Sequence, residues 1–406
     1  SGFRVLAVAH RIVRGRPGYT VADEAEMTLD GFLLFADPPK EGAREALQAL
    51  AELGIAVKVI TGDNRHVAAH VADAVGLGQT ALLTGAEIAQ MRDEALWHAA
   101  ERTTLFVEID PQQKDRIVRA LQHRGHAVGF LGDGINDAPA LHSADVGISV
   151  EGAADVARES ADIVLLTADL DVLRRGVIDG RRTFANTMKY IAITTSANFG
   201  NMLSMAVAVP LLPFLPLLPK QILLNNFLSD LPSMAISTDR VDPERLAVPQ
   251  RWNIRQITRF MILFGSVSSV FDGLTFLLLM TVLQAGETEF HTVWFVVSLL
   301  TELAVVLVLR TWRPVWRSPP APLLVWSTVA VGAAALALPF VLPVQQVFGF
   351  GTPDWKAVIM ILAIVGAYVV VTEAVKLSFA RQFGASGSAR AGSDKDDDDV
   401  SGHQNG

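Results

Sequence analysis

The 406-residue sequence contains no cysteine, which excludes disulfide bonds and thiolate metal sites. It also lacks a signal peptide and an initiating Met, since it opens with "SGFRVLAVAHRIV", and we therefore expect it to be part of a longer protein. Charge is scarce between residues 188 and 377, where long apolar runs have the composition of membrane-spanning helices. Residues 1–180, in contrast, have the composition of a soluble protein.

The soluble half alternates strand-like and helix-like segments. Helices are expected over residues 40–53 and over residues 111–124, the latter with Pro in its first turn, where a missing N–H costs nothing. Such alternation predicts an α/β domain with a parallel sheet covered by helices on both faces. In such folds the polar residues at the strand carboxyl ends carry the chemistry. The expected strands are 31–35, 55–61, 104–109, 127–133 and 146–150.

The second half predicts an all-α bundle of six membrane-spanning helices. Arginines concentrate in the connections 237–257 and 310–317, which the positive-inside rule assigns to the cytoplasm. Prolines at every third position of residues 210–219 exclude a helix interior there and indicate an outer loop or a broken helix start. The expected spans are 188–209, 214–236, 258–283, 292–309, 321–343 and 355–377.

The most specific motif is "GDGINDAPAL", which follows the expected strand 127–133. Asp133, Asn136 and Asp137 supply hard oxygen ligands at one turn, a pattern that suits Mg²⁺ and phosphate chemistry. Thr61 and Lys114 each follow another expected strand, where a hydroxyl or an ammonium can contact a phosphoryl group. Taken singly, Thr61 is more simply a turn residue and Lys114 a solvated lysine.

Four motifs together resemble the phosphorylation domain of the P-type cation-transporting ATPases, within the haloacid-dehalogenase-like superfamily. The resemblance continues through "GRRTFANTMKYIAITTSANFGNM" (180–202) and is greatest to the bacterial magnesium-transporting members. The four motifs are "DPPK" (37–40), "TGDN" (61–64), "DPQQKDRIV" (110–118) and "GDGINDAPALHSADVGIS" (132–149).

This resemblance implies roles for single residues. Asp133 and Asp137 would hold the catalytic Mg²⁺, and Asp37 would shape the hinge toward the ATP-binding domain. The residues that would act around the transferred phosphoryl group are Thr61, Gly62, Asp63, Lys114 and Asn136.

Several parts of such a pump are absent from the sequence. It contains no Asp-Lys-Thr-Gly-Thr phosphorylation motif, because Thr-Gly occurs only at Thr61–Gly62 and Thr84–Gly85. The Thr-Gly-Glu loop, four membrane helices and most of the nucleotide domain are missing as well. We therefore expect residues 1–30 to end the nucleotide-binding domain, residues 31–180 to form a partial phosphorylation domain, and the acceptor Asp to lie outside the chain. A non-catalytic regulatory fragment and a membrane-tethered phosphatase remain alternatives.

Polar residues inside the expected spans are candidates for the transported cation. Asn198 and Asn201 share a face of the first span, and Asn226 and Asp230 share a face of the second. Glu302 lies where calcium pumps carry a site glutamate. Interhelical hydrogen bonds are the alternative role for the asparagines.

Asp272 is a further intramembrane acid, for which a local interhelical bond or a position near the membrane interface is a plainer interpretation than cation contact. The few acids and several amides favour a partly hydrated Mg²⁺, although Glu302 keeps Ca²⁺ as an alternative. We expect a bacterial plasma-membrane protein with its soluble domain and C-terminus in the cytoplasm, and no nucleic-acid partner. A helix over about 169–190 would couple the sheet to the first span, and residues 379–406 would form a disordered acidic tail.

Overall fold

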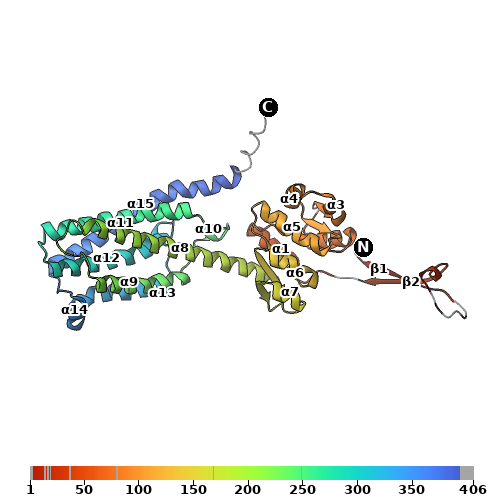
Figure 1. Ribbon diagram of the computed structural model, residues 1–406, viewed down its shortest axis with the longest axis horizontal. Coiled ribbons are helices and arrows are strands. Elements are labelled where there is room, and N and C mark those ends of the chain that lie inside the picture. Colours follow the sequence, from red (N-terminus) through yellow and green to blue (C-terminus); the bar gives the residue numbers. More distant parts are fainter. Residues whose placement is uncertain are drawn as a thin grey trace, which may run out of the picture. The chain divides into compact units, whose positions relative to one another are not determined.

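The computed structural model forms two compact units, Ser1–Val177 and Ile178–Gly406 (Figure 1). Asp37 lies outside the described residues, as do residues 394–406 of the expected acidic tail. The structure describes residues 3–12, 15, 18, 20–35, 38–78, 81–167, 169–247 and 249–393.

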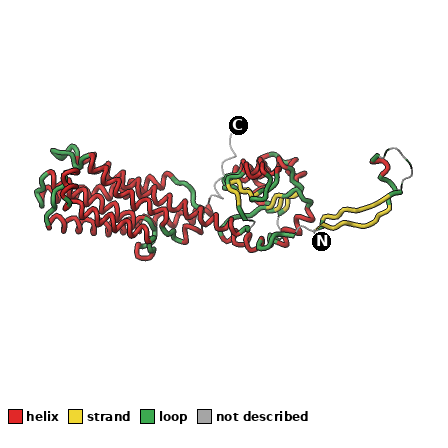
Figure 2. The backbone as a smooth tube through the Cα atoms, turned by 90° about the horizontal axis from the view of Figure 1, so that it is seen from below, coloured by secondary structure: helices red, strands yellow, loops and turns green. Residues whose placement is uncertain are grey.

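The first two strands form a separate antiparallel hairpin (Figure 2). Strand β1 (Arg4–His10) pairs with β2 (Thr28–Phe35), and a short 3₁₀ turn, η1 (Val21–Asp23), lies between them in the chain. The prediction that residues 31–35 belong to the parallel sheet is therefore wrong, and the expected domain boundary at residue 30 falls inside β2. An apolar run of this length does not distinguish a hairpin strand from a buried parallel strand.

The parallel sheet prediction is confirmed by two three-stranded parallel sheets, ordered β3-β5-β4 and β6-β7-β8. Four strands lie within the segments expected from the sequence, whereas β4 and β8 were not predicted. Ile60 and Val128 pack in the apolar cores of both sheets, so the two sheets are neighbours. The strands are β3 (Val59–Ile60), β4 (Leu82–Thr84), β5 (Leu105–Val107), β6 (Gly129–Leu131), β7 (Val146–Val150) and β8 (Ile163–Leu165).

Helices follow the strands in this unit, and both expected helices are confirmed. Asp110 caps α5 through a hydrogen bond from the Gln113 N–H, and Asn64 caps α2 in the same way. The helices are α1 (Ala43–Glu52), α2 (Arg65–Ala74), α3 (Gly85–Gln90), α4 (Asp93–Arg102), α5 (Pro111–His123), α6 (Ala138–Ser143) and α7 (Asp155–Ser160), with the 3₁₀ turn η2 (Ile135–Asp137).

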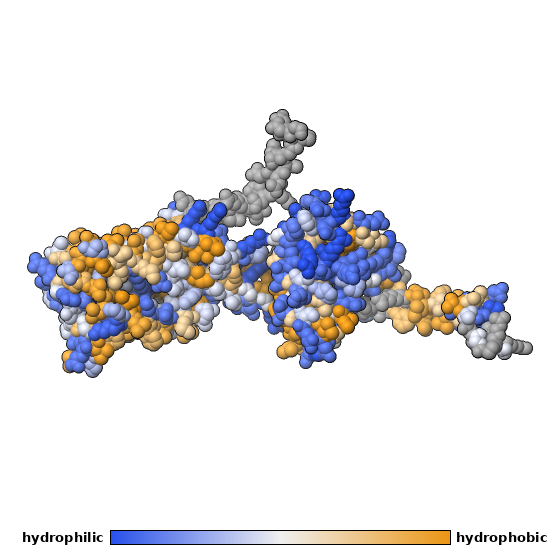
Figure 3. Space-filling model, viewed as in Figure 1, coloured by the Kyte–Doolittle hydropathy of each residue, from blue (hydrophilic) through white to orange (hydrophobic). Residues whose placement is uncertain are grey.

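The second unit is a helical bundle with a largely apolar surface (Figure 3). Among the described residues, four segments are long and apolar enough to cross a membrane, namely 254–281, 287–309, 322–340 and 355–381. The principal helices are α8 (Asp171–Ala208), α9 (Pro219–Ala235), α11 (Ile254–Thr281), α12 (Glu287–Leu309), α13 (Pro322–Ala337) and α15 (Trp355–Ser393). Shorter elements join them: η3 (Ile236–Thr238), α10 (Pro243–Ala247), η4 (Val315–Arg317), η5 (Leu338–Phe340) and α14 (Leu342–Phe348).

Two of the six expected spans, those in α8 and α9, are not among these four segments. Helix α9 has only 17 residues, and the apolar half of the 38-residue α8 is interrupted by polar residues such as Asn198 and Asn201. The helix expected over 169–190 is part of α8, which continues without interruption to Ala208. Residues 210–218 are not helical, as their prolines predicted. Helix α15 continues past residue 379, where the tail was expected to begin, to Ser393.

Helix α12 lies at the centre of the bundle. It packs against α9, α11, α13 and α15, and 83% of its most apolar 18-residue window is buried. Large apolar side chains of α12, among them Phe290, Trp294 and Phe295, form the main core of the unit. A polar residue on α12 is therefore held in a rigid, mostly apolar surrounding.

Candidate functional site

The two acids of the "GDGIND" motif, in the turn after β6, lie in different surroundings. Asp137 is buried, and its Oδ1 lies 2.6 Å from Nζ of Lys114 on α5. Its Oδ2 accepts a hydrogen bond of 3.0 Å from the Gly134 N–H. Asp133 is exposed, and its carboxylate makes no hydrogen bond within the described part of the chain. One acid is thus neutralised by a lysine and the other remains open.

Gly132 is required by this arrangement. A Cβ atom at residue 132 would lie 2.6 Å from Cβ of Asp137 and 2.9 Å from the Phe130 ring, both closer than atoms can approach. The Gly132 carbonyl accepts a hydrogen bond of 2.9 Å from the buried Ser149 hydroxyl on β7. These contacts fix the chain where it leaves β6, and therefore the direction of the Asp133 side chain.

Asp133 lines a cavity of about 210 Å³ at the carboxyl end of β6, β7 and β8. Lys40, from the "DPPK" motif, lines the same cavity, together with Thr167 and Asp169. Among the described residues, no group of three or more His, Cys, Asp or Glu side chains is placed to hold a metal ion. An open carboxylate on a solvent-accessible cavity nevertheless fits Mg²⁺, which keeps several waters and needs one or two carboxylates.

The structure does not bring all predicted phosphoryl-transfer residues into direct contact. Thr61 follows β3, and its Oγ1 accepts a hydrogen bond of 3.1 Å from the Asp63 N–H, not from a residue of the Lys114–Asp137 pair. Gly62 lies between them in the same turn, and Asn136 is exposed in η2. Thr61 and Asp133 thus lie at the carboxyl ends of two neighbouring sheets, and their convergence on one phosphoryl group stays a prediction.

The bundle contains a second cavity, of about 290 Å³, between α8, α9 and α12. Asn198, Asn201 and Asn226, all predicted cation-site residues, line it. Glu302 on α12 lies behind this wall, where its Oε1 accepts hydrogen bonds from Nδ2 of Asn201 and from Nδ2 of Asn225, the latter at 3.3 Å. The structure therefore joins Glu302 to two helices of the cavity.

Asn225 was missed by the sequence analysis, which paired Asn226 with Asp230. Asn225 is buried, and its Oδ1 has no hydrogen-bond partner in the described part of the chain. Asp230 is exposed and does not line the cavity, so the face of α9 turned toward Glu302 carries Asn225 and Ser229 instead. The sequence contains a pattern for this face too, because Asn225 and Ser229 are also four residues apart and therefore share one face of the helix.

Asp272 lies inside the bundle, and the predicted interhelical bond is confirmed. Its Oδ2 is 2.6 Å from Oγ of Ser204 on α8, and its Oδ1 accepts from Nε1 of Trp294 on α12 at 3.0 Å. Trp294 also lines the cavity of the bundle. Asp272 therefore supports the wall of that cavity and does not face its interior.

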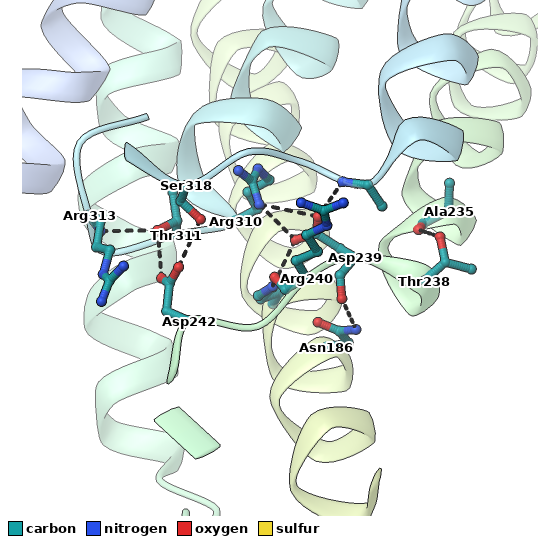
Figure 4. A network of polar contacts seen from close by, with 12 residues as sticks. Asn186, Ala235, Thr238, Asp239, Arg240, Asp242, Arg310, Thr311, Arg313 and Ser318 are labelled. Atoms are coloured by element: carbon teal, nitrogen blue, oxygen red, sulfur yellow. Dashed lines mark hydrogen bonds and ion pairs between the residues drawn. The ribbon is translucent and has the colours of Figure 1, made fainter. Parts of the chain in front are cut away.

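A buried ionic cluster at the arginine-rich end of the bundle was not predicted from the sequence (Figure 4). The carboxylate of Asp239 contacts Nζ of Lys189 at 2.8 Å and Nη1 of Arg310 at 3.1 Å, and all three side chains are almost fully buried. Asn186 donates to the Asp239 carbonyl oxygen. Asp239 thereby joins α8, the α9–α11 connection and the end of α12.

A second acid of the same connection extends the cluster. Asp242 accepts hydrogen bonds of 2.6 Å from the Thr311 hydroxyl and 2.8 Å from the Ser318 hydroxyl (Figure 4). Acids alternate with arginines in "STDRVDPER" (237–245), which could have indicated local ion pairs in addition to membrane orientation.

Each of the two units contains a region that matches a known protein family. Residues 214–378 match the family described as cation transporting ATPase, C-terminus, and residues 11–145 match the haloacid dehalogenase-like hydrolases. The chain is 46% identical over 390 residues to magnesium-transporting ATPase, P-type 1, of Escherichia coli K12, and equally to that of Salmonella typhimurium LT2. It is 31% identical over 336 residues to a putative cation-transporting ATPase of Methanocaldococcus jannaschii.

The chain belongs to the P-type cation-transporting ATPases. The two bacterial matches cover 95% of the chain but 43% of each relative, and the archaeal match covers 81% and 40%. The chain thus spans less than half the length of the P-type ATPases that it matches. The family identity accounts for the presence of a haloacid-dehalogenase-like unit and an apolar helical unit in one chain.

Proposed function

We propose that this chain is the C-terminal part of an ATP-driven P-type pump that moves Mg²⁺ into the cytoplasm. The phosphate acceptor Asp would lie in a segment outside these 406 residues, and the whole pump would cycle through an aspartyl-phosphate. The observation that carries the proposal is the partly buried Glu302 carboxylate, which accepts hydrogen bonds from the amides of Asn201 and Asn225 behind the wall of a cavity among apolar helices.

In the soluble unit, Asp133 would be the direct Mg²⁺ ligand, and Asp137 would complete the site from its pair with Lys114. The bound Mg²⁺ would neutralise charge on the phosphoryl oxygens during transfer. Lys114 is already committed to a carboxylate at 2.6 Å, so it would contact phosphate only as that pair rearranges. Thr61, with Gly62 and Asp63 in its turn, and Asn136 would hydrogen-bond the phosphoryl group of ATP.

In the bundle, the cavity would hold the transported cation. The orphaned Oδ1 of Asn225 supports a ligand there, because a buried carbonyl oxygen without a partner costs free energy that a cation or its water would recover. One carboxylate with several amides suits a cation that keeps part of its hydration, as Mg²⁺ does. Ca²⁺ is the second candidate, because Glu302 supplies the carboxylate that Ca²⁺ sites commonly use.

The polar face of α8 and α9 supports a partner in the membrane. Asn198, Asn226 and Asp230 are exposed there, and an acid facing lipid is costly. Protein must therefore cover this face, and we infer that membrane helices from the remainder of the pump do so. Asp230 would then join the cation site from that side.

The membrane arrangement follows from the same proposal. Helices α8 and α9 would cross the bilayer together with the four apolar segments, giving six spans in a bacterial plasma membrane. The arginine-rich connections, the soluble unit and the C-terminus would be cytoplasmic. The continuous helix α8 would transmit movement of the soluble unit to Asn198 and Asn201.

The experiment is phosphorylation by radiolabelled ATP. The DNA preceding the codon for Ser1 should encode an in-frame Asp-Lys-Thr-Gly-Thr, and the complete pump should form an acid-stable phosphoenzyme that Asp133→Asn abolishes. The present chain alone should remain unlabelled. Labelling of the chain alone, or normal labelling of the Asp133→Asn pump, would contradict the proposal.

A further inference from the structure

Asp272 is almost fully buried in the bundle, with 3% of its surface exposed. The residues around it supply hydrogen-bond donors but no cation, since no lysine, arginine or histidine in the described ranges forms an ion pair with it. The titratable groups that face it from neighbouring helices are Glu302 on α12 and Tyr368 on α15. An ionised Asp272 would therefore be an uncompensated charge among apolar helices, which is strongly unfavourable.

The contacts of Ser204 support a proton on Asp272. Its Oγ lies 2.9 Å from the carbonyl oxygen of Gly200 and 2.6 Å from Oδ2 of Asp272. A hydroxyl has one hydrogen to donate, and a carbonyl oxygen can only accept. If Ser204 donates to Gly200, then the contact with Asp272 requires a hydrogen on Oδ2 of the acid.

With that proton in place, each contact has one donor and one acceptor. The Asp272 O–H donates to Ser204, Ser204 donates to Gly200, and Trp294 Nε1–H donates to Oδ1 of Asp272. We propose that Asp272 is a proton-binding site, a neutral carboxylic acid that joins α8, α11 and α12 and holds the indole of Trp294.

This assignment has a consequence for the cavity. Trp294 lines the cavity and is fixed from behind by Asp272, which makes Asp272 a positioning residue. A neutral acid fixes that wall without placing a second negative charge behind Glu302. The consequence for cation selectivity rests on the proposed function, whereas the protonation of Asp272 does not.

The test is infrared difference spectroscopy on the full chain in lipid nanodiscs at neutral pH. The spectrum of the wild type minus Asp272→Asn should contain one protonated-carboxyl C=O band that shifts in D₂O. The matched control is Glu302→Gln. The spectrum of this variant should still contain the band, because Asp272 is unchanged in it. Asn can donate to Ser204 and accept from Trp294 as the acid does, so Asp272→Asn should also keep the melting temperature, while Asp272→Leu should lower it.

A pair of carboxylate bands in place of the C=O band would overturn the proposal. Ser204→Ala provides a second test that needs no change at Asp272, because it removes the acceptor of the acid proton. It should move the C=O band to higher frequency, and an unchanged band would contradict the proposed hydrogen bond. Neither result depends on ATP hydrolysis or transport, so failure here is distinguishable from failure of the proposed pump.

Discussion

The ammonium of Lys114 lies 2.6 Å from Oδ1 of Asp137, whereas the carboxylate of Asp133, four residues earlier, opens onto a cavity. The side chains of the pair are only 16% and 10% exposed, so water screens their attraction weakly. Two acids of one turn therefore have different environments. This division assigns a structural contact to Asp137 and a free coordination position to Asp133.

Removing the lysine should destabilise the turn after β6. Lys114→Met leaves Asp137 mostly buried without a counter-charge, and we expect a loss of about 2–3 kcal/mol, between the values for exposed and buried pairs. Hydrogen exchange of the full chain, followed by mass spectrometry over residues 129–141, measures this loss of stability. Lys40→Met removes the same charge from the neighbouring cavity and is the control. Equal protection in both variants would contradict a stabilising role for the pair.

A side chain at residue 132 should displace Asp137. Gly132→Ala would place Cβ 2.6 Å from Cβ of Asp137, and relief of this overlap should cost about 1–3 kcal/mol. Gly152→Ala is the control, because nothing lies within 4 Å of a Cβ atom there. We expect a lower melting temperature and weaker Mg²⁺ binding for Gly132→Ala alone. Similar behaviour of both variants would show that the turn is not packed as described.

The ionic cluster in Figure 4 predicts losses of stability of different size for substitutions of its members. Asp239→Ala leaves Lys189 and Arg310 buried together without their carboxylate and should cost about 3–5 kcal/mol. Lys189→Met leaves one acid paired with one arginine and should cost less. Thermal unfolding of the chain in nanodiscs would compare them. A larger effect of Lys189→Met would contradict the assignment of Asp239 as the centre of the cluster.

The exposed ion pair of Arg313 and Glu244, near this cluster, should contribute less to stability in acid. A hydrogen bond from Arg313 lowers the pKa of the Glu244 carboxyl below its usual 4.5. The ionised carboxylate therefore favours the folded state above pH 4.5, and this contribution is lost as the pH falls through the lower folded pKa. Melting temperatures of the wild type and Glu244→Gln should differ slightly at neutral pH and converge in acid. A difference that persists in acid would exclude the ion pair as its cause.

The sequence predicted most elements whose signal is local. The prolines of 210–218, Pro111 at the start of α5 and the "GDGIND" turn depend on backbone chemistry that a short segment contains. Strands β4 and β8 were not predicted, although β5 and β6, which are equally short, were. Strand β2 was assigned to the wrong sheet because an apolar run does not specify its partner.

The candidate sites depended more on contacts between distant segments. Lys189, Asp239 and Arg310 are separated by 50 and 71 residues, so no spacing rule joins them. The same applies to Asn225, whose partner Glu302 lies 77 residues away. To choose between Asn225 and Asn226, one has to know which face of α9 is turned toward Glu302. Asp230 is exposed and does not line the cavity, so under the proposed function it would join the site only through membrane helices outside this chain.

The most direct test of the account is ATP-driven cation release by the complete pump from proteoliposomes loaded with Mg²⁺ or Ca²⁺, with ATP and its catalytic Mg²⁺ added outside. Pumps whose soluble unit faces outward use this ATP, and we predict that they move Mg²⁺ out of the lumen. Glu302→Gln should reduce this release at least about tenfold, while Asp354→Asn, which does not line the cavity, should leave it unchanged. Normal Mg²⁺ release by the Glu302→Gln pump would contradict the assignment of this cavity as the transport site.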